Sequence, residues 1–154
     1  MQHELDVRFK QVENFTGSAE SSIVDERLKS YLYKLGAVLI CGNIEQSVQI
    51  ILLSRLHARA HPRVLNFVKS HFTRGQNLDC AAISQLLQRF DAEWYRKFQK
   101  FVEDNPSVKE GVSSCYAVRN SVAHGGAMGV GGKRIMELLD ASKTLLDAVV
   151  RSTA

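Results

Sequence analysis

The sequence predicts one all-α domain spanning residues 1–154. Apolar residues recur every three or four positions along nearly the whole chain, which is the spacing of one face of an α-helix. No run alternates apolar and polar residues between turn signals, so no strand is predicted. A chain of this length can bury one core without disulfides or metals. We therefore predict an all-α bundle of about five helices.

The first predicted helix is long and follows a short N-terminal segment that ends in the polar sequence GSAESS. Gly36 and Gly42 lie within this helix and mark either a kink or a close contact with another helix. Its apolar residues keep one face, at Leu28, Leu32, Leu35, Leu39, Val48, Ile51, Leu52 and Leu56.

Four more helices are predicted after it. Pro62 begins a short one, because proline has no N–H to lose in a first helical turn, and Gly75 ends it. Ser107 and Glu110 form a capping box for a helix that runs to HGG, where Gly125 or Gly126 can take the left-handed terminal position. A last helix follows AMGVGG. The strongest amphipathic run lies between the helix that Pro62 begins and the helix that begins near Ser107. Its apolar residues recur every three or four positions throughout, and they are Ile83, Leu87, Phe90, Trp94, Phe98 and Phe101.

The composition is typical of a soluble globular protein, with 45% apolar and 23% charged residues. Cys41, Cys80 and Cys115 are odd in number and lack CxxC spacing, so neither a disulfide framework nor a metal cage is predicted. They are interpreted as free thiols in the cytoplasm. No apolar leader and no uncharged apolar run of about 18 residues is present, so no membrane association is predicted.

The net charge of +4 is unevenly distributed. No acidic residue lies between Glu45 and Asp79, and this stretch holds five basic residues, Arg55, Arg59, Arg63, Lys69 and Arg74. Arg55 and Arg59 are four apart and share a helix face, which suits a phosphate backbone. We predict that Arg55, Arg59 and Arg63 bind RNA, and a solvated helix end is the alternative.

The sequence RNSVAH, residues 119–124, combines three polar side chains near the end of one predicted helix. Arg119 falls on the same face as Val112 and Cys115 and so interrupts an apolar stripe. Asn120 and His124 are four apart on an adjacent face, and the nearby helix C-terminus favours the imidazolium. A fixed cation, an amide and a proton carrier together suit metal-independent cleavage of RNA by the ribose 2′-hydroxyl.

Spacing alone leaves a structural alternative open for the same residues. Arg119 could extend its stem to the surface, and Asn120 could be an ordinary residue of a helix end. His124 would then be a charge at a helix C-terminus with a small stabilising effect.

At these residues the sequence resembles the HEPN domains, specifically the RiboL-PSP-HEPN group. The motif is R-N-x-x-x-H, from Arg119 to His124. CGNIEQSVQIILLSRL, which contains Glu45, and AISQLLQRFDAEWYRKF are similar to the second and fourth segments of that group. The resemblance covers roughly residues 25–150 and leaves residues 1–22 as an N-terminal extension.

The resemblance implies a homodimer that brings two motifs together across a cleft. It implies a metal-independent endoribonuclease without a cofactor, which leaves 2′,3′-cyclic phosphate and 5′-hydroxyl ends on its RNA substrate. It also implies a toxin–antitoxin or antiphage setting, in which an antitoxin or inhibitor protein is a further possible partner.

The same resemblance assigns roles to four residues. Arg119 would bind and polarise the scissile phosphate through its fork of donors. His124 would move one proton, and the His124 of the second subunit would make the opposite transfer. Asn120 would hold the phosphate or the histidine. Glu45 would contact Arg119 or the ribose, or else form a structural pair with an arginine.

The sequence also contains three weaker motifs. GAMGVGGKR lacks the first glycine and the final Ser or Thr of a phosphate-binding loop, so we predict a flexible loop from which Lys133 or Arg134 contacts RNA. His57 and His61 are four apart, but a third zinc ligand is not evident and arginines surround them, so no metal site is predicted. Cys115 could act as a thiol nucleophile, but core packing is the expected role.

The rival functional prediction is a non-catalytic helical adaptor. In that case the bundle dimerises and binds a partner protein or RNA, and the motif shapes the interface. An intact motif does not prove catalysis, because function depends on the site rather than on the fold.

Overall fold

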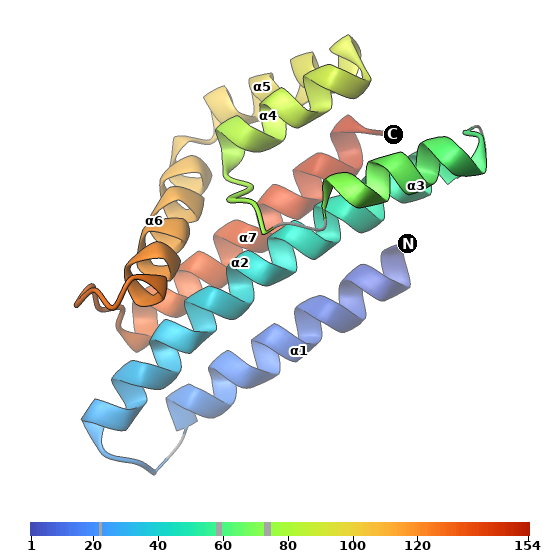
Figure 1. Ribbon diagram of the computed structural model, residues 1–154. Coiled ribbons are helices and arrows are strands. Elements are labelled where there is room, and N and C mark those ends of the chain that lie inside the picture. The colour runs from blue at the N-terminus through green and yellow to red at the C-terminus, as the bar shows by residue number, and fades with distance from the viewer. Residues whose placement is uncertain (22, 58–59, 73–74) are drawn as a thin grey trace.

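The computed structural model describes residues 1–21, 23–57, 60–72 and 75–154. Within these ranges the chain forms seven α-helices and no strand, so the predicted all-α class is confirmed and the predicted number of about five is too low (Figure 1). The helices are α1 (Gln2–Ser21), α2 (Glu26–His57), α3 (Pro62–His71), α4 (Cys80–Phe90), α5 (Ala92–Asp104), α6 (Pro106–Ala123) and α7 (Gly132–Ser152).

The N-terminal segment is a helix in its own right. The predicted break GSAESS lies mostly inside α1, which continues to Ser21. The helix packs against α2 and α7, and the Tyr33 hydroxyl of α2 donates a hydrogen bond to the Glu20 carboxylate near its end. Its buried side chains are too sparse to give a clear apolar face in the sequence, and they are Leu5, Val12, Thr16 and Ala19.

The strongest predicted amphipathic run is divided into α4 and α5 by Asp91. The backbone of Asp91 is extended, with φ −160° and ψ 127°. The N–H of Asp91 donates a hydrogen bond to the Leu87 carbonyl, at the C-terminal end of α4. Its Oδ1 accepts hydrogen bonds from the N–H groups of Glu93 at 2.7 Å and Trp94 at 3.0 Å. Asp91 is therefore the N-cap of α5, a role that aspartate fills well. The apolar spacing continues across the break, so periodicity alone could not locate it.

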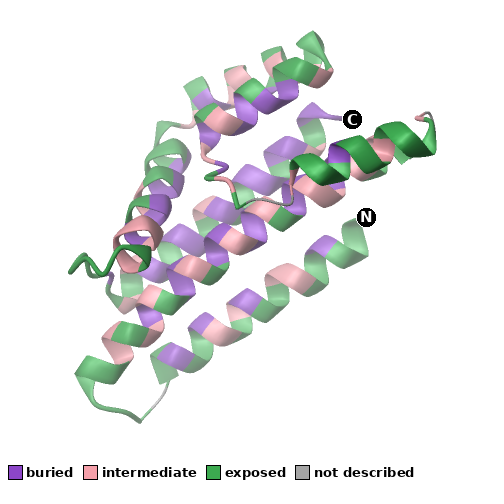
Figure 2. Ribbon diagram, in the orientation of Figure 1, coloured by how far each residue is buried: buried purple, intermediate pink, exposed green. Residues whose placement is uncertain are grey.

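The core lies where α2 and α7 run side by side through the centre of the bundle (Figure 2). Ile40, Ile44 and Ile135 are fully buried there. A Cβ atom at Gly36 would lie 3.3 Å from Cγ1 of Ile135, whereas one at Gly42 would meet nothing within 4 Å. Gly36 therefore marks a close helix contact, one of the two alternatives predicted for it.

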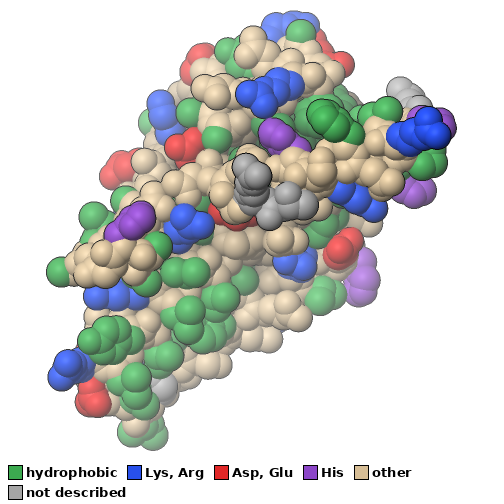
Figure 3. Space-filling model, in the orientation of Figure 1, with side chains coloured by type: hydrophobic (Ala, Val, Ile, Leu, Met, Phe, Trp, Pro, Cys, Tyr) green, Lys and Arg blue, Asp and Glu red, His purple; other side chains and the backbone are tan. Residues whose placement is uncertain are grey.

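The N-terminal half of α2 leaves an apolar row uncovered. We call this row, which consists of Leu28, Tyr31, Leu35 and Leu39, the α2 stripe. Figure 3 shows hydrophobic side chains gathered over this part of the molecule. By length and composition α2 could cross a membrane, but 56% of its most apolar stretch is buried in the bundle, as in the core helix of a soluble protein. The side chains of the stripe are 37% to 55% exposed.

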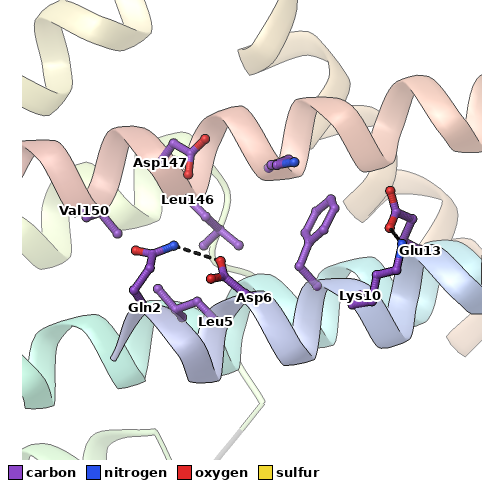
Figure 4. Close-up of a pocket in the computed structure, with 10 residues that line it drawn as sticks. Gln2, Leu5, Asp6, Lys10, Glu13, Leu146, Asp147 and Val150 are labelled. Carbon is purple, nitrogen blue, oxygen red and sulfur yellow. Dashed lines mark hydrogen bonds and ion pairs between the residues drawn. The ribbon is translucent and has the colours of Figure 1, made fainter.

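A hollow of about 270 Å³ lies between α1 and α7. Several of the α1 side chains that line it pair with one another. Gln2 Nε2 donates to Asp6 Oδ1 at 2.9 Å, and Lys10 forms an ion pair with Glu13 at 2.6 Å (Figure 4). This hollow belongs to the contact between the two helices, and we place no candidate site in it.

The two ends of α6 differ in how well they were predicted. The helix begins at Pro106, with Asn105 as its N-cap and no side-chain cap bond, so the predicted capping box at Ser107 is wrong. Gly125 has φ +70°, a left-handed conformation that glycine adopts without strain. The predicted glycine terminus is therefore confirmed, and α6 ends directly before His124.

Candidate active site

Helix α6 turns Arg119 towards α2, on the face that its apolar residues occupy. Val112 and Cys115 on this face are buried, and Arg119 is half-buried. The Sγ atoms of Cys115 and Cys41 of α2 lie 3.6 Å apart. Arg119 is one helical turn beyond Cys115 on α6, and Glu45 is one helical turn beyond Cys41 on α2. Because α6 runs towards the N-terminal half of α2, where Gly125 and Gly126 lie beside Tyr31 and Leu35, this spacing does not by itself bring the two side chains together.

The guanidinium of Arg119 is held by two amide oxygens. Its Nη1 donates to Asn120 Oδ1 at 3.0 Å and to Asn77 Oδ1 at 3.2 Å. Asn77 Nδ2 also donates to Asn120 Oδ1, at 3.4 Å. The three side chains therefore form one closed network, which fixes the direction of the guanidinium.

Asn77 reaches this network from the connection that precedes α4. Leu78, the next residue, is only 2% exposed and anchors the connection in the core. A Cβ atom at Gly75 would lie 3.8 Å from Nη2 of Arg119, so the backbone of the connection passes close to the guanidinium. Sequence reasoning missed Asn77, because nothing in its local sequence relates it to a motif more than forty residues away.

Glu45 lies near Arg119 without pairing with it. The carboxylate is half-buried, and no ion pair joins it to Arg119 among the described residues. Burial raises the pKa of Glu45, and the positive charge of Arg119 opposes that rise. Glu45 and Arg119 therefore form no ion pair, and the alternative contact with a ribose stays a prediction.

His124 is the C-terminal cap residue of α6 and is exposed to solvent. Its backbone N–H donates to the Asn120 carbonyl at 3.1 Å, and its imidazole makes no hydrogen bond or ion pair with any residue that the structure describes. It is five residues beyond Arg119, so the two side chains leave the helix in different directions. The motif thus brings Arg119 and Asn120 together and leaves His124 accessible one turn further on.

A family model described as RiboL-PSP-HEPN matches residues 3–154. The chain belongs to the RiboL-PSP-HEPN family. Membership indicates an RNase-type or nucleotide-binding function, and HEPN domains often bind RNA and dimerise. Comparison with curated proteins and with solved structures gave no match.

Of the three arginines that were predicted to bind RNA, Arg55, Arg59 and Arg63, the first already has partners within this HEPN protein. Arg55 donates from Nη2 to the Val150 carbonyl at 3.0 Å and from Nε to Thr153 Oγ1 at 3.3 Å, so it caps the end of α7. Arg63 is exposed at the start of α3, and Arg59 lies outside the described residues. At 1.5 Å per residue, Arg55 is about 15 Å further along α2 than Glu45. Any RNA contact at Arg55 would therefore lie well away from Glu45.

The other two predicted RNA-binding residues lie at the start of α7. Arg134 donates to Glu137 at 3.0 Å and to Ser114 at 3.1 Å, whereas Lys133 is exposed. The loop before them follows α6 rather than a strand, unlike a phosphate-binding loop. Lys133 is thus the freer cation of the two.

The remaining candidates have other roles in the HEPN fold. Cys115 is fully buried, as expected for core packing rather than for a nucleophile. The Nδ1 atom of His61 accepts a hydrogen bond from the Arg63 N–H at the start of α3. Within the described ranges, no three His, Cys, Asp or Glu side chains gather as they would around a metal ion.

Proposed function

We propose that this HEPN protein is a metal-independent endoribonuclease. The observation that carries the proposal is the guanidinium of Arg119, which two amide oxygens hold in place at the end of α6. Its Nε and Nη2 atoms donate to none of the described residues, so they remain for a phosphate. The exposed His124 follows one turn later.

The proposed reaction is a transfer of the phosphoryl group within the RNA. The 2′-oxygen attacks the adjacent phosphorus, the P–O5′ bond breaks, and the products carry a 2′,3′-cyclic phosphate and a 5′-hydroxyl. One group must remove the 2′-proton and another must protonate O5′. Arg119 stabilises the charge that develops on the phosphoryl oxygens. Because Asn120 Oδ1 accepts from Arg119, Asn120 orients this cation and has its own amide N–H groups left for the phosphate.

The need for two proton transfers supports a homodimer. One chain offers a single exposed histidine in the motif, so we assign the second transfer to the His124 of another subunit. The α2 stripe is suited to hold that subunit, because exposed apolar patches mark interaction sites. A hollow of about 530 Å³ joins Tyr31 and Leu35 of the stripe to Gly125 and Gly126, directly after His124. A subunit on the stripe would therefore also cover the turn that carries the motif.

Removal of the imidazole tests the enzyme proposal directly. We expect the protein to cleave single-stranded or transfer RNA in excess EDTA, and His124→Ala to lower the rate by about 10²- to 10⁴-fold, the usual contribution of acid–base catalysis. His3→Ala, which removes another exposed histidine, is the matched control and should cleave normally. End-group analysis should find 2′,3′-cyclic phosphates. RNA binding without cleavage by the intact protein would instead support the adaptor.

A smaller effect is expected for Asn77→Ala. The guanidinium loses one of the two acceptors that hold it, and a hydrogen bond to a charged group contributes about 1.5–3 kcal/mol. Because Asn77 is exposed, we expect the lower part of this range, about a tenfold slower cleavage. Gln76→Ala is the control, since Gln76 donates to the His71 carbonyl instead. Equal single-turnover rates for the two variants would contradict a role for Asn77.

We place the enzyme in the cytoplasm, in a toxin–antitoxin or antiphage setting with a possible antitoxin or inhibitor protein. The three cysteines are free, and Cys41 and Cys115 remain thiols although their sulfur atoms are 3.6 Å apart. Such a pair fits a reducing compartment. Growth arrest on expression that His124→Ala relieves would support the toxin setting.

A further inference from the structure

A third hollow lies between α1 and α2, beside Glu45. Its volume is about 490 Å³, within the range of about 300–1,000 Å³ that is common for small-molecule sites. Glu45 forms part of its wall, and the positive charge of Arg119 acts on the same carboxylate. The polar side chains that line it are Arg8, Gln11, Asn43, Glu45 and Gln46.

Arg8 is the unusual member of this lining. Its Nε atom is buried and has no hydrogen-bond partner, and the guanidinium forms no ion pair with any residue that the structure describes. A buried donor without an acceptor costs about 1–3 kcal/mol. Arg8 lines the hollow and has no partner for its Nε atom within the described chain, so its guanidinium is suited to bind a hydrogen-bond acceptor of another molecule.

The chemistry of the hollow favours a nucleotide of RNA. A guanidinium presents a fork of donors that matches the oxygens of a phosphate. Gln11 and Gln46 supply amides that can bind the edge of a base, and Val12 and Val38 supply apolar contact for its face. The Glu45 carboxylate disfavours a second phosphate at its end of the hollow, which leaves a ribose hydroxyl as the group that fits there.

We propose that Arg8 binds a backbone phosphate of the RNA, so that α1 forms one wall of the RNA groove. The inference rests on the proposed ribonuclease function and extends it to a substrate subsite. It gives the N-terminal helix a part in substrate binding.

The test measures RNA binding apart from cleavage. In the His124→Ala background, the Kd for a fluorescent single-stranded RNA is determined over a series of salt concentrations. We expect Arg8→Gln to weaken binding about tenfold, as loss of a charged hydrogen bond does, and to reduce the salt slope by about 0.7, the value for one phosphate contact on a single strand. Lys10→Gln removes the same charge from α1 in the ion pair of Figure 4, and should bind normally.

A scan with neutral methylphosphonates then identifies the phosphate. One substitution should weaken binding by the Arg8 protein and have no effect on Arg8→Gln. Equal affinities of Arg8→Gln and Lys10→Gln would overturn the proposal. So would a loss of self-association in Arg8→Gln at unchanged RNA affinity, because the hollow would then belong to a protein contact. If the intact protein fails to cleave RNA but the Arg8-dependent binding persists, the nuclease proposal fails and the phosphate subsite stands.

Discussion

Arg119→Lys is expected to slow RNA cleavage by about 10²- to 10³-fold, the effect of removing one fixed donor from a developing negative charge. Lysine keeps the positive charge but loses the planar fork. Its single ammonium group cannot hold the Asn77 and Asn120 oxygens in the present geometry and still present two aligned donors to a phosphate. The loss should therefore appear in the rate of the chemical step.

The measurement is single-turnover cleavage in EDTA at saturating protein, together with thermal unfolding. Arg89→Lys is the matched control, because Arg89 is exposed on α4. Arg89→Lys should unfold near the temperature of the unchanged protein, since exposed substitutions usually alter stability by about 0.5 kcal/mol or less. Arg119→Lys should unfold at a somewhat lower temperature, because it loses hydrogen bonds to Asn77 and Asn120, and it should remain folded in the assay. A normal rate for Arg119→Lys would show that only the charge of this residue is used.

The site was predictable only where its residues are close in sequence. Arg119 was found because a charge interrupts an apolar helix face, and α6 does bury that face. Asn77 could not be found, because its contact with Arg119 depends on how the connection before α4 folds over α6. Contact with Arg119 was one of the alternatives predicted for Glu45, but the separation of the two depends on the packing of α2 against α6, which no spacing along the chain encodes.

What could be predicted from the charge pattern and from the apolar pattern of the sequence was limited in the same way. Arg55 belongs to a stretch without acidic residues, but its donors bind the end of α7, a partner almost one hundred residues away. The apolar spacing of α2 predicted one long helix correctly. Periodicity does not distinguish a face that packs in the core from a face that is left for another molecule, and in α2 both occur on one helix.

Leu35→Asp is expected to convert a dimer into a monomer and to lower cleavage by about 10²-fold or more, because the second proton carrier is lost. Leu35 lies in the middle of the α2 stripe and beside the turn after His124. Burying a carboxylate against the apolar stripe of another subunit is strongly unfavourable. The same side chain is 45% exposed in the single chain, so the fold itself should tolerate the change.

Sedimentation velocity gives the oligomeric state, and the EDTA assay gives the rate at the same protein concentration. Phe67→Asp places the same charge on α3, where the phenylalanine is 76% exposed and lies outside the stripe. This control should remain dimeric and active. If the unchanged protein cleaves RNA as a monomer, His124 of a second subunit is not required, and the second proton must come from the same chain or from water. If Leu35→Asp stays dimeric and active, the subunits meet on another face.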